Sequence, residues 1–320
     1  MPEINDRIRP ALRTLQSDRK SLRHWLRPVL SGAALPLLIL LLLHGCAEVV
    51  RSDRLQVVAS IEPLAWFVER IGGNRVAVSV MVPPGGDPHS YEPSPKQMAM
   101  LDSAVLFVKA GSGVEFELNW MPRILELNRR LRVCDASAGV QLIPMTDDAS
   151  HDGPEHRHGM YDPHYWLSPE NARLIAINVE RSLADADPSH RAEYAANRLA
   201  LDRELKDLGD RIRARLAGAK SRRFIVFHPA WGYYAHEFGL QQIAAEEQGK
   251  TLTPVQMVRV IDKAREHAIH TVFVSPQFSS AQAEAIARDI GGTTVQVDPL
   301  SRDYENNLMR ATEAIAGELR

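Results

Sequence analysis

Four short stretches of this sequence place a side chain that can bind a metal next to a proline. They are Asp87-Pro88-His89, Asp162-Pro163-His164, His228-Pro229 and Asp298-Pro299. Imidazole nitrogen and carboxylate oxygen are ligands that divalent zinc accepts, and that manganese and iron accept in other proportions. The sequence therefore predicts one metal site, built from His89, His164, His228 and Asp298, which lie far apart along the chain.

The types of these four residues favour binding over catalysis. Three imidazoles and one carboxylate complete a tetrahedron around Zn²⁺, which leaves no open position for a reactive water. Manganese sites use more oxygen donors, and a glutamate at position 228 would favour Mn²⁺. Because this position is His228, zinc is the first expectation and manganese the second. Soft Cu(I) would require thiolates or thioethers, and these loops contain neither.

Each of the four also has an ordinary structural interpretation. His89 and His164 could be turn or helix-capping residues, and His228 could be a hydrogen-bonded histidine of the core. Asp298 stands before a proline, where aspartate often begins a turn. The sequence alone leaves these alternatives open.

The elements that must position the four residues alternate between strands and helices. A β-branched run at residues 76–82 precedes the His89 loop, and similar runs precede His228 and Asp298. Such alternation is typical of βαβ units with a largely parallel sheet, in which ligands bind beyond the carboxyl ends of strands. Ile71-Gly72-Gly73 and Ile290-Gly291-Gly292 each lead from a helical pattern into a strand pattern, which suggests two similar lobes facing one cleft.

Residues 188–216 have one long helical pattern that no proline interrupts after Pro188. At about 1.5 Å per residue this helix would extend roughly 40 Å. It either links two lobes as a rigid spine or lies on the surface of a single domain. With the first interpretation, the sequence predicts an α/β protein with an N-terminal lobe at 55–187, a linking helix at 188–217 and a C-terminal lobe at 218–320.

The first 45 residues are typical of a signal peptide. Seven Lys or Arg residues precede the apolar core at 35–43, which is too short to span a bilayer, since spanning requires roughly 20 residues. Leu43-His44-Gly45-Cys46 resembles a bacterial lipobox, which predicts lipidation of Cys46 and a tether at 46–54. The alternative is an uncleaved signal anchor. If Cys46 carries lipid, Cys134 has no disulfide partner, and it is expected to be a small buried strand residue.

Charge and length restrict the remaining functional classes. The 320 residues suffice for two domains, and the chain beyond the first 45 residues carries more acidic than basic side chains. A mildly acidic protein is not expected to bind nucleic acid.

Residues 146–160 lack apolar periodicity and include His151, His156 and His158. This segment is either a solvated loop or a secondary, low-affinity metal-collecting loop.

The motifs around His89, His164, His228 and Asp298 resemble those of cluster A-I solute-binding proteins, the zinc and manganese receptors of bacterial ABC importers. The resemblance covers about residues 55–318, with the motifs in matching order. It implies two α/β lobes joined by a long helix, with His89 and His164 supplied by the first lobe and His228 and Asp298 by the second.

The same resemblance implies a role for the protein. It would be a monomeric, lipid-anchored, periplasmic or cell-surface receptor that passes its metal to a permease and an ATPase, and it would not be an enzyme. Two alternatives stay open: a zinc-dependent hydrolase with Asp298 as base, and a surface adhesin on the same scaffold.

Overall fold

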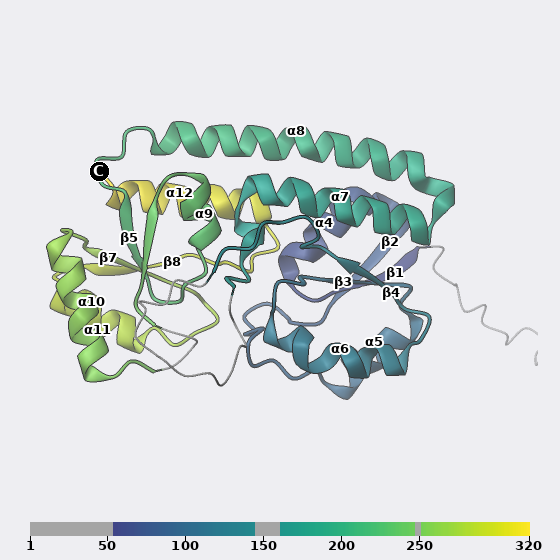
Figure 1. Cartoon of the computed structure of the whole chain (residues 1–320), viewed down its shortest axis with the longest axis horizontal. Helices are drawn as coiled ribbons and strands as arrows, with labels where there is room; N and C mark the ends of the chain where they lie inside the picture. The colour runs from purple at the N-terminus through teal and green to yellow at the C-terminus, as the bar shows by residue number, and fades with distance from the viewer. Residues whose placement is uncertain (1–53, 145–160, 247–250) are drawn as a thin grey trace, which may run out of the picture. The chain divides into compact units, whose positions relative to one another are not determined.

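The computed structural model describes residues 54–144, 161–246 and 251–320 (Figure 1). The predicted signal peptide, Cys46, nearly all of the predicted tether and the loop at 146–160 lie outside these residues. The chain divides into Met1–Ser52 and Asp53–Arg320, and all described residues belong to the second unit. In the described part of the chain, no helix is both long and apolar enough to cross a membrane.

The first lobe contains a parallel sheet with helices packed on its faces. Within the described residues the sheet has four strands, in the order β2-β1-β3-β4. The strands are β1 (Leu55–Ala59), β2 (Val76–Val80), β3 (Leu106–Lys109) and β4 (Arg132–Asp135). The helices are α4 (Glu62–Gly72), α5 (Pro95–Ser103), α6 (Glu115–Leu127) and α7 (Pro169–Ala186), with the short 3-10 turns η1 (Gly73–Arg75) and η2 (Tyr165–Leu167).

The second lobe repeats this plan. Its described strands form a second parallel sheet, in the equivalent order β6-β5-β7-β8. The strands are β5 (Arg223–Val226), β6 (Gln241–Ala244), β7 (Thr271–Val274) and β8 (Thr293–Gln296). The helices are α9 (Gly232–Glu237), α10 (Pro254–Glu266), α11 (Ala281–Asp289) and α12 (Tyr304–Glu318). The predicted fold class, two α/β lobes with mainly parallel sheets, is confirmed.

A long helix, α8 (Arg191–Leu216), runs along both lobes (Figure 1). It packs against α4 and α7 of the first lobe and against α12 of the second. Its buried positions recur at helical spacing, for example Leu201, Leu205, Leu208 and Ile212. The helix is therefore a spine that both lobes share.

The linking helix was predicted to start at Pro188, whereas α8 begins at Arg191. Residues 188–190 form the separate 3-10 turn η3 (Pro188–His190), because the residue before a proline avoids helical backbone angles. Asp187 has φ −137° and ψ 77°, and its carboxylate accepts a hydrogen bond from the Tyr194 hydroxyl at 2.7 Å. This contact ties the turn between α7 and α8 to the first turn of α8.

The two glycines before β8, Gly291 and Gly292, have different structural roles. Gly291 has φ +67°, a left-handed conformation that favours glycine at the end of a helix. At Gly292 a Cβ would lie 1.8 Å from the carbonyl oxygen of His270, so only glycine fits beside that backbone. The pair therefore ends α11 and lets β8 start directly beside β7.

One hydrophobic core extends through both lobes. It joins side chains of the first sheet, such as Val58 and Phe107, to Leu205 of α8 and to Leu308 and Ile315 of α12. A second, smaller cluster lies between the second sheet and helices α10 and α11. A shared core on the α8 side indicates that the lobes have little freedom to separate there.

Candidate metal centre

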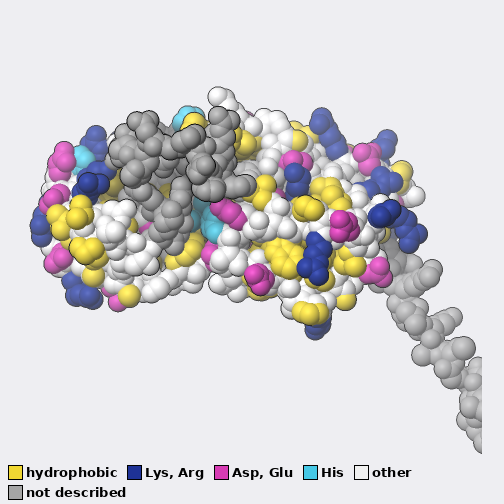
Figure 2. Space-filling model, turned by 60° about the horizontal axis from the view of Figure 1, so that its bottom comes forward, with side chains coloured by type: hydrophobic (Ala, Val, Ile, Leu, Met, Phe, Trp, Pro, Cys, Tyr) yellow, Lys and Arg dark blue, Asp and Glu magenta, His cyan; other side chains and the backbone are white. Residues whose placement is uncertain are grey.

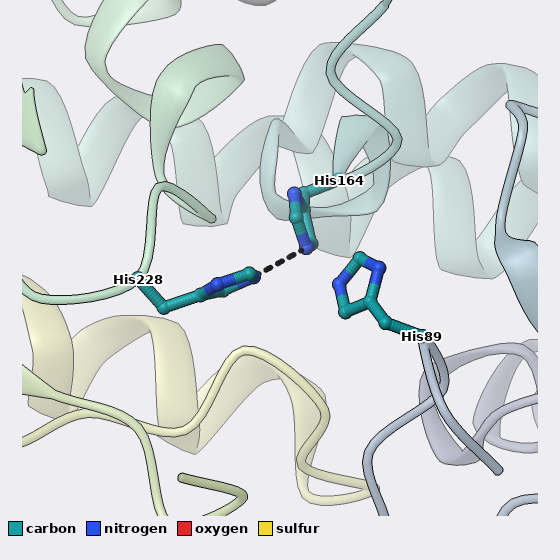
Figure 3. A group of neighbouring side chains, drawn as sticks. All are labelled: His89, His164 and His228. Carbon is teal, nitrogen blue, oxygen red and sulfur yellow. Dashed lines mark hydrogen bonds between the residues drawn. The ribbon is translucent and has the colours of Figure 1, made fainter. Parts of the chain in front are cut away.

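Three of the four predicted ligands meet between the lobes. His89 lies in the loop after β2, His164 directly precedes η2, and His228 follows β5. Their ligand nitrogens all lie within 4.8 Å of one another (Figure 3). His164 and His228 are buried, and His89 is partly exposed. Side chains separated by up to 139 positions in the sequence thus form one cluster.

The two Asp-Pro-His motifs fold in the same way at the backbone. Asp87 Oδ1 accepts a hydrogen bond from the main-chain N–H of His89, and Asp162 Oδ1 accepts one from that of His164, each at 2.9 Å. The aspartate of each motif therefore forms a tight turn that presents the histidine two residues later. Only Asp162 also contacts the imidazole, at 2.8 Å from Nδ1 of His164.

Every imidazole of the cluster has a carboxylate at its Nδ1 atom. Glu115, the first residue of α6, lies 2.7 Å from Nδ1 of His89, and Glu246, after β6, lies 2.5 Å from Nδ1 of His228. Asp162 completes the set at His164. A carboxylate at Nδ1 favours the tautomer with the proton on that atom, which leaves the Nε2 lone pair free for a metal.

The spacing of two Nε2 atoms fits a zinc ion. Those of His164 and His228 lie 3.4 Å apart. Two nitrogens bound tetrahedrally to zinc at about 2.0–2.1 Å are also roughly 3.4 Å apart. The ligand nitrogen of His89 lies within 4.8 Å of those of His164 and His228, so it stands beside the same position.

The ionisation of the imidazoles differs across the cluster. Burial opposes a charge on His89, but the hydrogen bond and the negative charge of Glu115 outweigh it, so the pKa of His89 is raised. For His228, burial lowers the pKa well below its ordinary value of 6.5, and the neighbouring His164 and His89 lower it further. His228 is therefore neutral near pH 7, the form that a metal requires, whereas His89 retains a proton more strongly.

Asp298 lies after β8, outside the group of three histidines. Its Oδ1 accepts hydrogen bonds from the Gln277 amide at 2.8 Å and from the Leu300 main chain at 2.9 Å. The residue also lines a cavity of about 260 Å³, whose walls include Pro84 and Gly85 of the His89 loop. A role for Asp298 as the fourth ligand therefore stays a prediction.

A tryptophan connects the ligand-bearing loops of the two lobes. The indole N–H of Trp166 donates to the carbonyl of Pro299 at 2.8 Å, and the Trp166 carbonyl accepts from the Tyr304 hydroxyl at 2.5 Å. The Trp166 ring also packs against His164, with 5.4 Å between the ring centres. Movement of one ligand loop relative to the other thus requires a buried hydrogen bond to break.

Sequence reasoning missed the three carboxylates behind the imidazoles. Asp162 could have been found, because it stands two residues before His164 in the same motif as Asp87 and His89. Glu115 and Glu246 lie 26 and 18 positions from their histidines, and no local pattern marks them. Phe278, whose ring centre lies 4.5 Å from that of His228, was missed for the same reason.

Two further predictions concern residues outside those described. These are lipidation of Cys46 and metal binding by His151, His156 and His158.

Cys134 is buried and free, as predicted, and burial raises the pKa of its thiol to about 11. It is therefore a core residue and not a reactive thiol.

Known proteins resemble this chain over most of its length. A family model described as the periplasmic component A of the zinc-uptake complex matches residues 57–317. The high-affinity zinc uptake system protein ZnuA of Bacillus subtilis is 29% identical over 259 residues, which cover 78% of this chain and 80% of that protein.

Solved structures give the same result. A crystal structure of ZnuA matches with a TM-score of 0.78 and 36% identity, over 84% of this chain and all of that one. The laminin-binding protein Lmb of Streptococcus agalactiae, described as bifunctional with adhesin and metal-transporting activity, matches with a TM-score of 0.72 and 25% identity. This match covers 83% of this chain and all of Lmb.

Proposed function

This chain belongs to the zinc-uptake complex component A family, and from that membership we propose that it captures Zn²⁺ outside the cytoplasm and delivers it to an ABC importer. The observation that carries the proposal is the convergence of three imidazoles between the lobes, each with a carboxylate at Nδ1. This arrangement holds three Nε2 lone pairs in one place, as a nitrogen-rich zinc site requires.

His89, His164 and His228 are proposed as ligands, with Asp298 as the fourth. Zn²⁺ is the expected cargo, because two imidazoles already have the spacing of a zinc tetrahedron and the relatives include zinc uptake proteins. Mn²⁺ is the second candidate, and it would use the carboxylate oxygen more than zinc does. The loop with His151, His156 and His158 is proposed as a secondary collecting site.

Capture would depend on local adjustments more than on a wide separation of the lobes. The shared core, α8 and the hydrogen bond from Trp166 to Pro299 restrict the lobes on the spine side. His89, in contrast, stands on a loop that is partly exposed. Metal binding would draw this imidazole towards His164 and His228 and expel any proton that it carries.

The proposed partners are the permease and the ATPase of an importer, with the receptor acting as a monomer. A lipid on Cys46 after removal of residues 1–45 would keep the receptor at the membrane, on the periplasmic or cell-surface side. The family consists of binding components, so we assign this chain the role of a receptor and not of an enzyme. A nucleic-acid partner is not proposed.

Isothermal titration of the apoprotein with Zn²⁺ tests the proposal. One tight site is expected, and His89→Ala, His164→Ala and His228→Ala should each weaken it by orders of magnitude. His236→Ala is the matched control, because His236 is an exposed histidine of α9 outside the cluster. The zinc affinity of this variant should equal that of the wild-type protein. Unchanged zinc affinity in the three cluster variants would refute the assignment.

An adhesin function is a second candidate, supported by the likeness to Lmb. It would require a surface that binds laminin without metal in the cleft. Binding of zinc-free and zinc-loaded protein to immobilised laminin separates the two roles. Saturable binding that His228→Ala leaves intact would support adhesion as an additional activity.

A further inference from the structure

The three imidazole–carboxylate pairs differ in their contact with solvent. The side chains of Asp162 and Glu246 are 6% and 3% exposed, and those of His164 and His228 are similarly buried. Glu115 is 38% exposed and His89 is 24% exposed. Histidine side chains reach the surface in the middle of the face shown in Figure 2. One pair of the three is therefore in contact with water.

The buried pairs form a fixed base for the metal. His164 is held by Asp162 at its main-chain N–H and at Nδ1, and the hydroxyl of Ser112 donates to the carbonyl of the preceding Pro163 at 2.7 Å. His228 is held between Glu246 and the ring of Phe278. Because no water competes for these contacts, the two imidazoles keep their spacing in the absence of metal.

The loop that carries His89 contacts the first turn of α6, where Tyr91 packs against Phe116 with 6.1 Å between the ring centres. The Phe116 N–H donates to the carbonyl of Pro88 at 3.0 Å, and Glu115 contacts the imidazole at 2.7 Å. A surface cavity of about 350 Å³ lies beside the loop, between His89–Glu92 and the α6 residues Asn119, Trp120 and Arg123. Solvent and an incoming ligand thus have access to the loop and to the helix that holds it.

We propose that Glu115 is a positioning residue that sets the rate of metal release, and that release begins when His89 separates from it. The inference rests on the proposed function and specifies which side of the site opens. Water competes with the exposed Glu115 carboxylate for the His89 Nδ1–H, so this contact breaks more readily than the two buried ones. Once His89 has turned away, the metal would stay on His164, His228 and the proposed ligand Asp298 until an acceptor takes it.

Release kinetics of the full chain test this inference. Zinc-loaded protein is mixed with excess EDTA in a stopped-flow instrument, and the release and association rates are measured separately. Loss of a carboxylate behind a metal-bound histidine typically lowers metal affinity about 10- to 100-fold. With association changed less than about threefold, Glu115→Gln should therefore accelerate release by about the same factor. Glu92→Gln removes an exposed carboxylate of the same loop and should release zinc at the wild-type rate.

Glu246→Gln is the comparison at a buried pair. A glutamine amide oxygen can accept the Nδ1–H at either position, but only at the exposed pair does water compete with this weaker contact, so release should accelerate less in Glu246→Gln than in Glu115→Gln. The inference would be overturned if Glu115→Gln released zinc at the wild-type rate, or if Glu246→Gln released it faster than Glu115→Gln. If the wild-type protein binds no zinc tightly, the proposed function itself fails.

A measurement on the unaltered protein gives an independent test. In zinc-loaded protein with ¹⁵N-labelled imidazoles, the Nδ1–H of His89 should exchange with water faster than those of His164 and His228. Equal exchange at the three rings would contradict a labile His89 pair, whatever the variants show.

Discussion

The two Asp-Pro-His motifs permit a matched pair of substitutions at the metal site. In Asp162→Asn the turn can persist, because an asparagine oxygen still accepts the main-chain N–H of His164. The buried negative charge at Nδ1 of His164 is lost, however, and with it the charge-assisted hydrogen bond of 2.8 Å. Asp87→Asn makes the same chemical change in the same turn, but Asp87 does not hydrogen-bond to the His89 imidazole.

The expected effects follow from these contacts. Loss of the carboxylate behind a metal-bound histidine typically lowers affinity 10- to 100-fold, or about 1.4–2.8 kcal/mol. We expect Asp162→Asn to weaken zinc binding within this range and Asp87→Asn to weaken it less than about threefold, because Asp87 acts on His89 only through its charge and the backbone turn.

Competition between each protein and a chromophoric zinc chelator at pH 7.5 measures both affinities. Thermal unfolding of the two apoproteins shows whether either substitution disturbs the fold. Equal weakening by both substitutions would mean that the turn matters and not the contact with the imidazole. No weakening by Asp162→Asn would refute the role of the carboxylates at Nδ1.

Three further predictions follow from the contacts around the site and from the fold. Glu115 raises the pKa of His89 above its ordinary value of 6.5, so protons compete with zinc for this imidazole already above pH 6.5. When the pH is lowered from neutral, the zinc affinity should therefore begin to fall before pH 6.5 is reached. In Glu115→Gln the fall should begin at lower pH, and identical titration profiles would contradict this. Trp166→Phe leaves the buried Pro299 carbonyl without its donor, so the free energy of unfolding from denaturant titration should decrease by about 1–3 kcal/mol, and an unchanged value would contradict this. Gly292→Ala places a Cβ against the His270 carbonyl, so its melting temperature should fall well below that of Gly317→Ala, a glycine of α12 with open space around it.

The sequence predicted the residues whose signals are local. The Asp-Pro-His motifs, the strands before His89, His228 and Asp298 and the Gly-Gly stops depend on neighbouring residues, and the structure places them as predicted. The fold class was predictable for the same reason, since strands and helices alternate in short segments.

Features that depend on contacts between distant residues were not predicted. Glu115 and Glu246 meet their histidines only after the sheets have formed, and nothing near them in the chain indicates this. The C-terminal helix α12 was also missed. Its buried face includes Tyr304, Leu308, Ala311 and Ile315 at helical spacing, so the signal for this helix is local and could have been found in the sequence. The linking helix was predicted to start at Pro188, whereas residues 188–190 form a separate turn and α8 begins at Arg191.

Anomalous scattering from crystals of the zinc-loaded protein, recorded on both sides of the zinc absorption edge, tests the central claim most directly. The account predicts one strong peak between the lobes, about 2.0–2.1 Å from Nε2 of His89, His164 and His228, with Asp298 supplying an oxygen at a similar distance. A principal peak elsewhere, or one that lacks any of the three imidazoles, would contradict it.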